Sequence, residues 1–185
     1  MLGATLCLPL LGPFALAAAE STSGPARSEL SASTPDLQLL EASGNPIALR
    51  KLLDGDGPVM VNFIFTSCAA ICPLMTETFA RVQKAIVPTH EPLRMVSISI
   101  DPEVDRPAVL QNYAANYHAG PQWHFVTGSS KDIDQVERAF GTWHQNKMDH
   151  AALVFLRASP SRPWVRMEGL VSADAILREY RSLPK

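Results

Sequence analysis

The 185-residue sequence predicts an α/β fold with a central, mostly parallel sheet and helices on both of its faces. Short apolar runs of the length of buried strands alternate with longer segments at helical spacing, a pattern typical of a parallel sheet. After this β-α-β beginning, the chain closes with two strands and a helix. That order of elements is the thioredoxin arrangement, so we expect a thioredoxin-like fold.

The first half of the predicted domain is built around a strand at residues 59–65, a compact apolar run rich in β-forming residues. Asp, Gly and Pro at 54–58 predict a loop before this strand, and residues 46–53 suggest a short strand or turn. A helix at 73–87 follows at helical spacing, and a second strand is expected at 93–100.

The second half contains two recognisable helix starts. Proline is tolerated in the first turn of a helix, so Pro107 is consistent with a helix that begins nearby. Ser129 or Ser130, followed by acidic residues, predicts the cap of another helix. The expected elements are helix 106–118, strand 122–127, helix 130–140, strands 151–156 and 164–167, and helix 172–183.

Residues 1–36 differ in composition from the rest of the chain. Residues 1–19 contain no charged side chain and end in three alanines, which is typical of a secretory signal peptide; a retained membrane anchor is the alternative. Residues 20–36 are rich in Ser, Thr, Ala and Pro and predict a flexible linker. We therefore expect an exported protein, periplasmic or anchored to the membrane facing the periplasm, with its folded domain at 37–185.

Charge and composition exclude one class of partner. The formal net charge is −2, with 46% hydrophobic and 18% charged residues, as in an ordinary globular chain. No run of Lys or Arg is present, whereas a nucleic-acid groove needs a concentrated basic face. We expect no nucleic-acid partner.

The expected export makes the cysteines informative. Cys7 lies in the predicted leader, so the mature domain carries only Cys68 and Cys72. In an oxidising compartment, two thiols at this spacing form a disulfide or bind a metal ion. They lie between the end of strand 59–65 and the helix opened by Pro73, and a helix N-terminus favours the thiolate form. Their spacing alone does not distinguish a disulfide from a metal site.

The segment expected to oppose the two cysteines is residues 147–151. Thiol oxidoreductases of the thioredoxin fold carry a cis-proline before the corresponding strand, but this segment has no proline and presents His150 instead. Two thiolates and one imidazole make a three-ligand site that suits Cu(I) and is compatible with Cu(II). Zinc is less natural, because it usually takes a fourth ligand or a water.

Four motifs stand out along the chain: the strand with C-x-x-x-C-P at 62–73, the block with D-P-E-V-D at 97–107, W-H-F-V-T-G at 123–128 and the pair Asp149-His150. They stand in the same order in the SCO/SenC copper proteins, and the chain resembles that family over residues 36–183. The chain departs from the family at Ala151, which is usually serine, and at 158–163, which replaces the usual D-P-x-G turn.

This resemblance implies that Cys68, Cys72 and His150 bind one copper ion, as Cu(I) or Cu(II). It also implies a copper metallochaperone that receives copper from a donor protein. The recipient would be the copper-centre subunit of a respiratory cytochrome oxidase or of a related copper enzyme. The two departures from the family lie outside the ligand set, so they concern subfamily and partner.

Two other functions remain open. A thiol–disulfide oxidoreductase would use Cys68 to attack a disulfide of the copper-enzyme partner and Cys72 to resolve the mixed disulfide. A redox or copper sensor would act through binding alone.

A few more residues near the predicted site have two interpretations each. Asp149 either orients the ligand imidazole or ends a loop. Asp101 and Asp105 either supply carboxylates near the site or cap a turn. Met148 as a transient copper contact is a hypothesis. The remaining histidines, which have no companion at metal-ligand spacing and are treated as ordinary, are His90, His118, His124 and His144.

Overall fold

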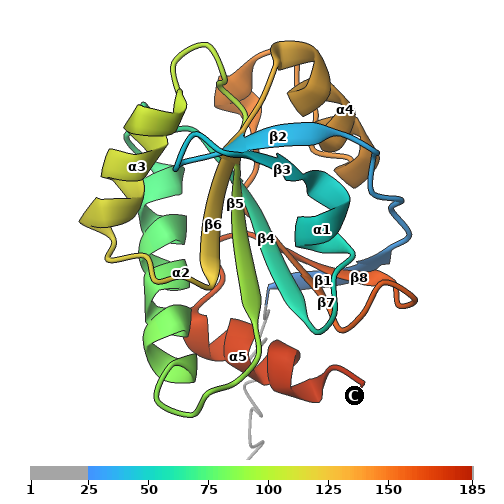
Figure 1. Ribbon diagram of the computed structural model, residues 1–185. Coiled ribbons are helices and arrows are strands. Elements are labelled where there is room, and N and C mark those ends of the chain that lie inside the picture. Colours follow the sequence, from blue (N-terminus) through green and yellow to red (C-terminus); the bar gives the residue numbers. More distant parts are fainter. Residues whose placement is uncertain (1–24, 185) are drawn as a thin grey trace, which may run out of the picture.

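One mixed sheet of eight strands forms the centre of the protein (Figure 1). The computed structural model describes residues 25–184. The strands lie in the order β1-β8-β7-β4-β5-β6-β2-β3. Their bounds are β1 Ala26–Leu30, β2 Gln38–Glu41, β3 Pro46–Ala48, β4 Val59–Ile64, β5 Arg94–Ser99, β6 Trp123–Thr127, β7 Leu153–Arg157 and β8 Trp164–Glu168.

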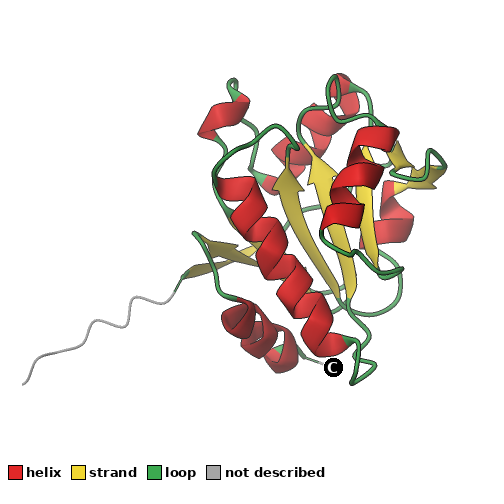
Figure 2. Ribbon diagram, turned by 90° about the vertical axis from the view of Figure 1, so that its left-hand side faces the viewer, coloured by secondary structure: helices red, strands yellow, loops and turns green. Residues whose placement is uncertain are grey.

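Helices cover both faces of this sheet. Helices α2, α3 and α5 pack on one face, and α1 and α4 pack on the other. Figure 2 shows α2 lying along the central strands. The helices are α1 Leu49–Leu53, α2 Ile71–Ile86, α3 Pro107–Asn116, α4 Ser130–Phe140 and α5 Ala173–Ser182, with a 3-10 turn at Lys147–Asp149. The predicted α/β class, with helices on both faces, is confirmed.

The alternation of side chains along β4 divides the core into two layers. Met60 and Ile64 face α2, α3 and α5, whereas Val61 and Phe63 face α1 and α4. Successive side chains of a strand point to opposite faces, and every side chain of β4 is buried, so this strand is covered on both sides. Both cysteines of the predicted site belong to the α2 layer.

The sheet is less parallel than the sequence predicts. Only two pairings, β4 with β5 and β5 with β6, are parallel; the pairings of β1 with β8, β8 with β7, β7 with β4, β6 with β2 and β2 with β3 are antiparallel. Helical crossovers produce parallel pairs, and within residues 25–184 such crossovers join neighbouring strands only between β4 and β5 and between β5 and β6. The strand–helix alternation therefore predicts only the arrangement of the middle strands. The strands on both sides of them join the sheet through antiparallel pairings.

A strand lies inside the segment predicted to be a flexible linker. Residues Ala26–Leu30 form β1, which pairs antiparallel with β8 over its whole length. Arg27 also makes a two-pronged ion pair with Glu179 of α5. The prediction of a linker over 20–36 is therefore wrong for these residues, and the sheet begins before residue 37. The side chains of Ala26–Glu29 are exposed and only Leu30 is half-buried, so the backbone pairing of β1 leaves no apolar pattern in the sequence.

The order of the strands brings two distant loops together. Because β4 and β7 are antiparallel neighbours, the end of β4 lies beside the beginning of β7. The loop after β4 carries Cys68 and Cys72, and the loop before β7 carries His150. The predicted leader at 1–19 lies outside the described residues. Within residues 25–184, no helix has both the length and the apolar character needed to cross a membrane.

Candidate metal centre

Cys68 lies in the short connection between β4 and the first turn of α2. Its backbone N–H donates to the carbonyl oxygen of Phe65 at 3.2 Å, which closes a turn directly after the strand. Helix α2 begins at Ile71, earlier than predicted, and no side chain caps its N-terminus. Instead, the N–H of Cys72 points at the Sγ atom of Cys68 at 3.5 Å. The sulfur thus accepts one of the N–H groups that a helix start leaves free.

Cys72 lies in the first turn of α2 and faces the core, where its exposed fraction is 1%, against 8% for Cys68. The carbonyl oxygen of Cys72 accepts a hydrogen bond from the hydroxyl of Thr76 at 2.8 Å. That hydroxyl also contacts the Tyr113 hydroxyl at 2.9 Å, so α3 supports this turn of α2. Both cysteines are free thiols.

His150 follows the 3-10 turn at Lys147–Asp149, whose start is capped by Asn146. The Nδ1 atom of His150 lies 3.0 Å from the carbonyl oxygen of Lys147. A carbonyl only accepts hydrogen bonds, so Nδ1 carries the proton and Nε2 is left with a free lone pair. Nε2 lies 3.4 Å from the Sγ atom of Cys72. The ring edge packs on Phe65 with the centroids 5.1 Å apart, and His150 is buried.

Burial and the helix start give the two thiols different acidities. Burial acts to raise the pKa of Cys68, but hydrogen bonds from the backbone N–H groups of Cys72 and Ala70, the Cys72 side chain and the N–H of Ile71 together outweigh it, so this pKa is lowered. Burial raises the pKa of Cys72 to about 12, and the nearby Cys68 adds to the rise. Cys68 is therefore the first of the pair to become a thiolate.

Burial also lowers the pKa of His150, against the opposing effect of its hydrogen bond to Lys147. The imidazole is accordingly neutral at neutral pH, which is the form that ligates metal ions.

The donor atoms fit a soft transition metal. Bonds of about 2.0–2.3 Å from nitrogen and sulfur to one tetrahedral ion place those two atoms roughly 3.5 Å apart. The 3.4 Å between Nε2 of His150 and Sγ of Cys72 matches this separation. No group of three His, Cys, Asp or Glu side chains among residues 25–184 is already arranged as a complete metal site. Binding through all three predicted residues therefore requires their side chains to adjust.

The other predicted residues do not join the sulfur–imidazole cluster directly. The side chain of Asp149 is exposed and makes none of the hydrogen bonds found within residues 25–184; the carbonyl of Lys147 orients the imidazole instead. Met148 is 65% exposed. The carboxylates of Asp101 and Asp105 are used in hydrogen bonds and ion pairs with the two loops that carry Cys68 and His150.

Two contributors were missed by sequence reasoning. Lys147 holds the His150 ring through its carbonyl and pairs with Asp101 through its ammonium group. Phe65 contacts the ring edge-on. A lone lysine in an irregular loop belongs to no periodic pattern, so nothing in the sequence marked it. Phe65 could have been suspected because it ends the strand that leads to Cys68.

Comparison with known protein families shows the family to which this chain belongs. The SCO1/SenC family model matches residues 26–184. The chain belongs to the SCO1/SenC family. The match begins at the first residue of β1, in agreement with the inclusion of that strand in the sheet.

Individual SCO1/SenC relatives match shorter segments. The SCO1 protein homolog of Bacillus subtilis is 41% identical over 73 residues, covering 39% of this chain and 38% of the relative. The mitochondrial SCO1 homolog of Homo sapiens is 32% identical over 88 residues, covering 46% of this chain and 29% of the relative. The matched segments thus span about a third of the length of these relatives.

Solved SCO1/SenC structures match nearly the whole fold. BsSco, described as a cytochrome c oxidase assembly protein with a disulfide switch, matches with a TM-score of 0.70 and 27% identity over 84% of this chain and 95% of that one. ScoI of Bradyrhizobium japonicum, solved with copper bound, gives 0.65 and 25% over 80% and 99%. A SCO1/SenC family lipoprotein of Bacillus anthracis gives 0.72 and 22% over 85% and 98%. The predicted thioredoxin-like fold and family are confirmed.

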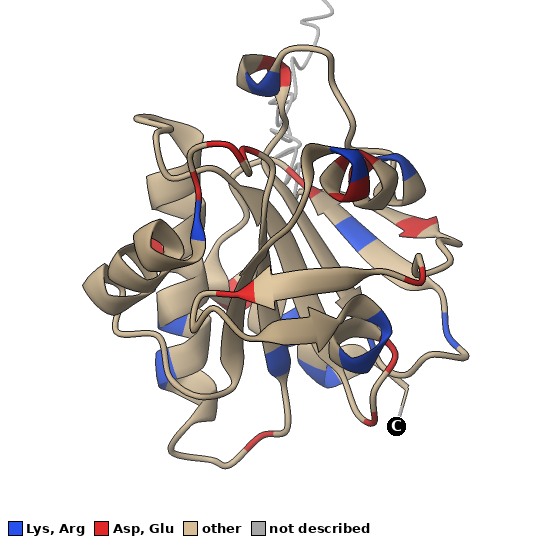
Figure 3. Ribbon diagram, turned by 45° about the horizontal axis from the view of Figure 1, so that its top comes forward, with Lys and Arg blue, Asp and Glu red and all other residues tan. Residues whose placement is uncertain are grey.

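In Figure 3, where the upper end of the molecule comes forward, basic and acidic residues are interspersed over loops and helices. In that view the basic residues do not gather into a single face.

Proposed function

We propose that the protein binds one copper ion through Cys68, Cys72 and His150 and delivers it to a respiratory copper enzyme such as cytochrome c oxidase. The observation that carries this proposal is the 3.4 Å approach of the His150 Nε2 atom to the Cys72 sulfur. Two further findings support it: the copper bound in the related ScoI of Bradyrhizobium japonicum, and the description of BsSco as an oxidase assembly protein.

The chemistry of the three side chains suits a carrier of Cu(I). Thiolates and an imidazole are soft to intermediate donors, and three of them leave a position at which a partner's ligand can enter. Copper is then cargo that leaves by ligand exchange. Handover requires reduced sulfurs, since a disulfide offers no thiolate. The recipient would be the copper-centre subunit of the oxidase, and a separate donor protein would load the site.

An anaerobic Cu(I) titration of the reduced protein tests the ligand assignment. Wild type should bind one equivalent, Cys68→Ser and Cys72→Ser should lose tight binding, and His150→Ala should bind more weakly. His144→Ala is the matched control, because it removes an exposed imidazole from the same loop. Unchanged stoichiometry and affinity in His150→Ala would contradict the assignment. An equal loss in His144→Ala would assign the effect to the loop.

Delivery and location are separate parts of the proposal. We propose that the chain is exported to the periplasm and held near the membrane by its N-terminal segment. Transfer is tested by mixing the loaded protein with the copper-free, soluble copper-centre domain of an oxidase. Copper should move to that domain and give its characteristic absorption spectrum, whereas retention on the carrier would contradict delivery.

The second candidate function is reduction of a partner's disulfide, favoured by the asymmetry of the two cysteines. Cys68 is less buried than Cys72, and its pKa is lowered while that of Cys72 is raised. The Cys68 thiolate would attack the partner disulfide and form a mixed disulfide, releasing one partner thiolate. Cys72, losing its proton, would then displace the second partner sulfur and close the Cys68–Cys72 disulfide, so two electrons pass to the partner.

Reduction of insulin disulfides distinguishes the two functions. Activity that survives in His150→Ala and does not respond to copper would favour the reductase. Activity absent from wild type would leave copper delivery as the proposed function.

A further inference from the structure

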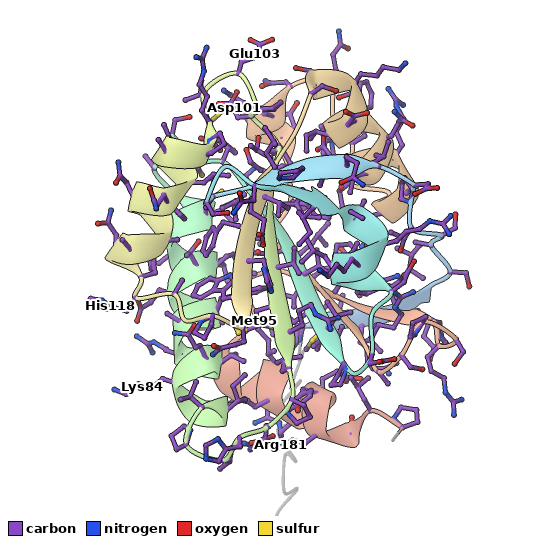
Figure 4. The ribbon with its side chains drawn as sticks, viewed as in Figure 1. Lys84, Met95, Asp101, Glu103, His118 and Arg181 are labelled. Carbon is purple, nitrogen blue, oxygen red and sulfur yellow. The ribbon has the colours of Figure 1, made fainter. Side chains whose placement is uncertain are left out.

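The turn at residues 101–105 contacts both loops of the candidate metal centre. It directly follows β5, and the N–H of Asp105 donates to the carbonyl oxygen of Asp101 at 2.8 Å, so the two acidic residues belong to one closed turn. In Figure 4, Asp101 lies at the upper end of the molecule, whereas Lys84 and Arg181 lie at the opposite end. The carboxylates of Asp101 and Asp105 each hold a different loop of the centre.

Asp105 anchors the loop after β4, called here the cysteine loop because it leads into Cys68 and Cys72. Its exposed fraction is 0%, and its carboxylate accepts hydrogen bonds from the backbone N–H of Thr66 at 3.0 Å and from the Thr66 hydroxyl. The Ser99 hydroxyl at the end of β5 donates to it at 2.7 Å. Thr66 stands two positions before Cys68, so the path of the chain into the cysteines is tied to this buried charge. Hydrogen bonds to a carboxylate are among the stronger ones in proteins.

Asp101 anchors the loop before β7, called here the histidine loop because it carries His150, and does so through Lys147. The Lys147 ammonium group forms an ion pair with the Asp101 carboxylate, and the Asp101 side chain is only 11% exposed. The same ammonium lies 5.4 Å from the centre of the Phe65 ring, which packs against His150. The carbonyl of Lys147 accepts the Nδ1–H of His150. One residue thus joins the turn to the imidazole by both its side chain and its backbone.

We propose that Lys147 is a positioning residue that orients His150 toward the cysteines. Its ammonium, anchored on Asp101, fixes the peptide carbonyl that keeps the proton on Nδ1 and points the Nε2 lone pair at Cys72. Because Asp105 of the same turn anchors the cysteine loop, residues 101–105 form a shared frame that sets the separation between imidazole and sulfurs. The consequence of this positioning for copper binding rests on the proposed ligand set. The orientation of the His150 ring by Lys147 does not depend on that proposal.

The role of Lys147 is positional rather than a large contribution to stability. The Lys147 side chain is 39% exposed, and ion pairs that solvent reaches contribute little to folding. Groups that orient a metal-ligating imidazole act on metal affinity rather than on folding stability, since their removal typically lowers that affinity by about 10–100-fold. A variant of Lys147 should therefore alter ring orientation and copper retention while leaving unfolding almost unchanged.

The test compares Lys147→Met, which keeps length without charge, with Lys147→Arg, which keeps the charge. Lys84→Met is the matched control, an exposed lysine of α2 at the far end of the molecule. Asp101→Asn removes the other half of the ion pair and serves as a second probe if Lys147→Met does not fold. Ring ¹⁵N–¹H spectra of the full chain, reduced and metal-free, report the His150 tautomer, and competition with a Cu(I) chelator reports retention.

We expect wild type, Lys147→Arg and Lys84→Met to show one Nδ1–H tautomer. Lys147→Met and Asp101→Asn should show mixed or exchange-broadened ring signals, with Cu(I) affinity lowered by about 10-fold. A single Nδ1–H tautomer and wild-type affinity in both Lys147→Met and Asp101→Asn would overturn the proposal. Loss of the single tautomer with unchanged copper affinity would support the positioning role and instead contradict His150 as a copper ligand.

Discussion

The Nε2 atom of His150 lies 3.4 Å from the Sγ atom of Cys72, although 78 positions of sequence separate the two residues. The antiparallel pairing of β4 with β7 creates this proximity, because it places the end of one strand beside the start of the other. The turn at 101–105 then fixes both loops on a third strand end. The proximity of the two loops is therefore a consequence of the strand order and of the turn that holds both loops.

Replacing His150 with Ala should leave disulfide formation between Cys68 and Cys72 intact. The two cysteines are brought together by the start of α2, through the N–H of Cys72 and the sulfur of Cys68, and the imidazole takes no part in that contact. Mild oxidation followed by mass spectrometry should show the loss of two hydrogens in both wild type and His150→Ala. If the variant stays reduced under conditions that oxidise wild type, the ring would be needed for cysteine approach, contrary to this account.

Cys68 should react with iodoacetamide at least about 10-fold faster than Cys72 in the reduced, metal-free protein, because the thiolate is the nucleophile. The pKa of Cys68 is lowered, so its reactivity should reach a plateau at a lower pH than that of an ordinary thiol. The pKa of Cys72 is raised to about 12, so its reactivity should still increase at the alkaline end of the measured range. Peptide mapping after short exposure separates the two sites. Equal rates would contradict the asymmetry and weaken the reductase proposal.

The location of the cysteine pair could be predicted from the sequence because it depends on local patterns. An apolar run rich in β-formers ends just before Cys68, and helical spacing begins just after Cys72, so both must lie at a strand–helix boundary. The position of the cysteines follows from the period of the side chains and the rule that chemistry gathers at strand ends. His150 needed more, namely the expectation that residues 147–151 oppose the cysteines in a thioredoxin-like fold and the resemblance of Asp149-His150 to the SCO/SenC motif.

The contacts that connect the two loops could not be predicted in this way. Lys147 is tied to Asp101 across 46 positions, and Asp105 to Thr66 across 39, and neither pair has a periodic pattern. β1 was missed because its pairing uses backbone groups while four of its five side chains stay exposed. The antiparallel sides of the sheet were missed because apolar alternation reveals that a strand exists but not the direction of its neighbour.

Removing β1 should destabilise the fold, in contrast to the removal of a flexible linker. A chain that begins at residue 32 keeps Thr34, which donates to Asp54, but exposes the edge of β8. We expect its free energy of unfolding to fall by roughly 1–3 kcal/mol relative to a chain that begins at residue 25, because several cross-strand pairs at about 0.2–1 kcal/mol each are lost. Urea unfolding measures the difference.

The ion pair of β1 supplies the control for this truncation. Arg27→Ala in the longer chain should cost only about 0.2–1 kcal/mol, as is usual for a largely exposed pair. A truncated chain as stable as the longer one would mean that β1 contributes nothing to the fold.

Asp105→Asn should loosen the cysteine loop as well as lower stability. The amide keeps one oxygen but turns an N–H₂ group toward donors that the carboxylate satisfied, namely Thr66 and Ser99. Leaving buried donors unpaired costs on the order of 1–3 kcal/mol. Asp174→Asn, at an exposed position in the first turn of α5, is the control. Faster alkylation of Cys68 in Asp105→Asn under native conditions is expected, and an unchanged rate would contradict the anchoring role of Asp105.

Glu137 of α4 should make the protein less stable as the pH rises through neutrality. Burial raises the pKa of this carboxyl from 4.5 to about 7, Asp134 adds to the rise, and Arg138 opposes it. The folded state therefore holds the proton more tightly than the unfolded state. This stabilising effect is fully present below pH 4.5, the ordinary value, and is lost as the pH rises through about 7.

The variant Glu137→Gln carries no titrating group at this position, so it should escape that loss. We expect it to exceed wild type in free energy of unfolding by up to about 3 kcal/mol at pH 8, with no comparable advantage at pH 4, since one unit of pKa shift corresponds to about 1.4 kcal/mol and this shift runs from 4.5 to about 7. Glu103→Gln, at an exposed position of the 101–105 turn, is the control and should not show this pH-dependent gain. Urea unfolding at both pH values measures the four differences. A Glu137→Gln advantage that is equal at pH 4 and pH 8 would mean that packing, and not the buried charge, is responsible.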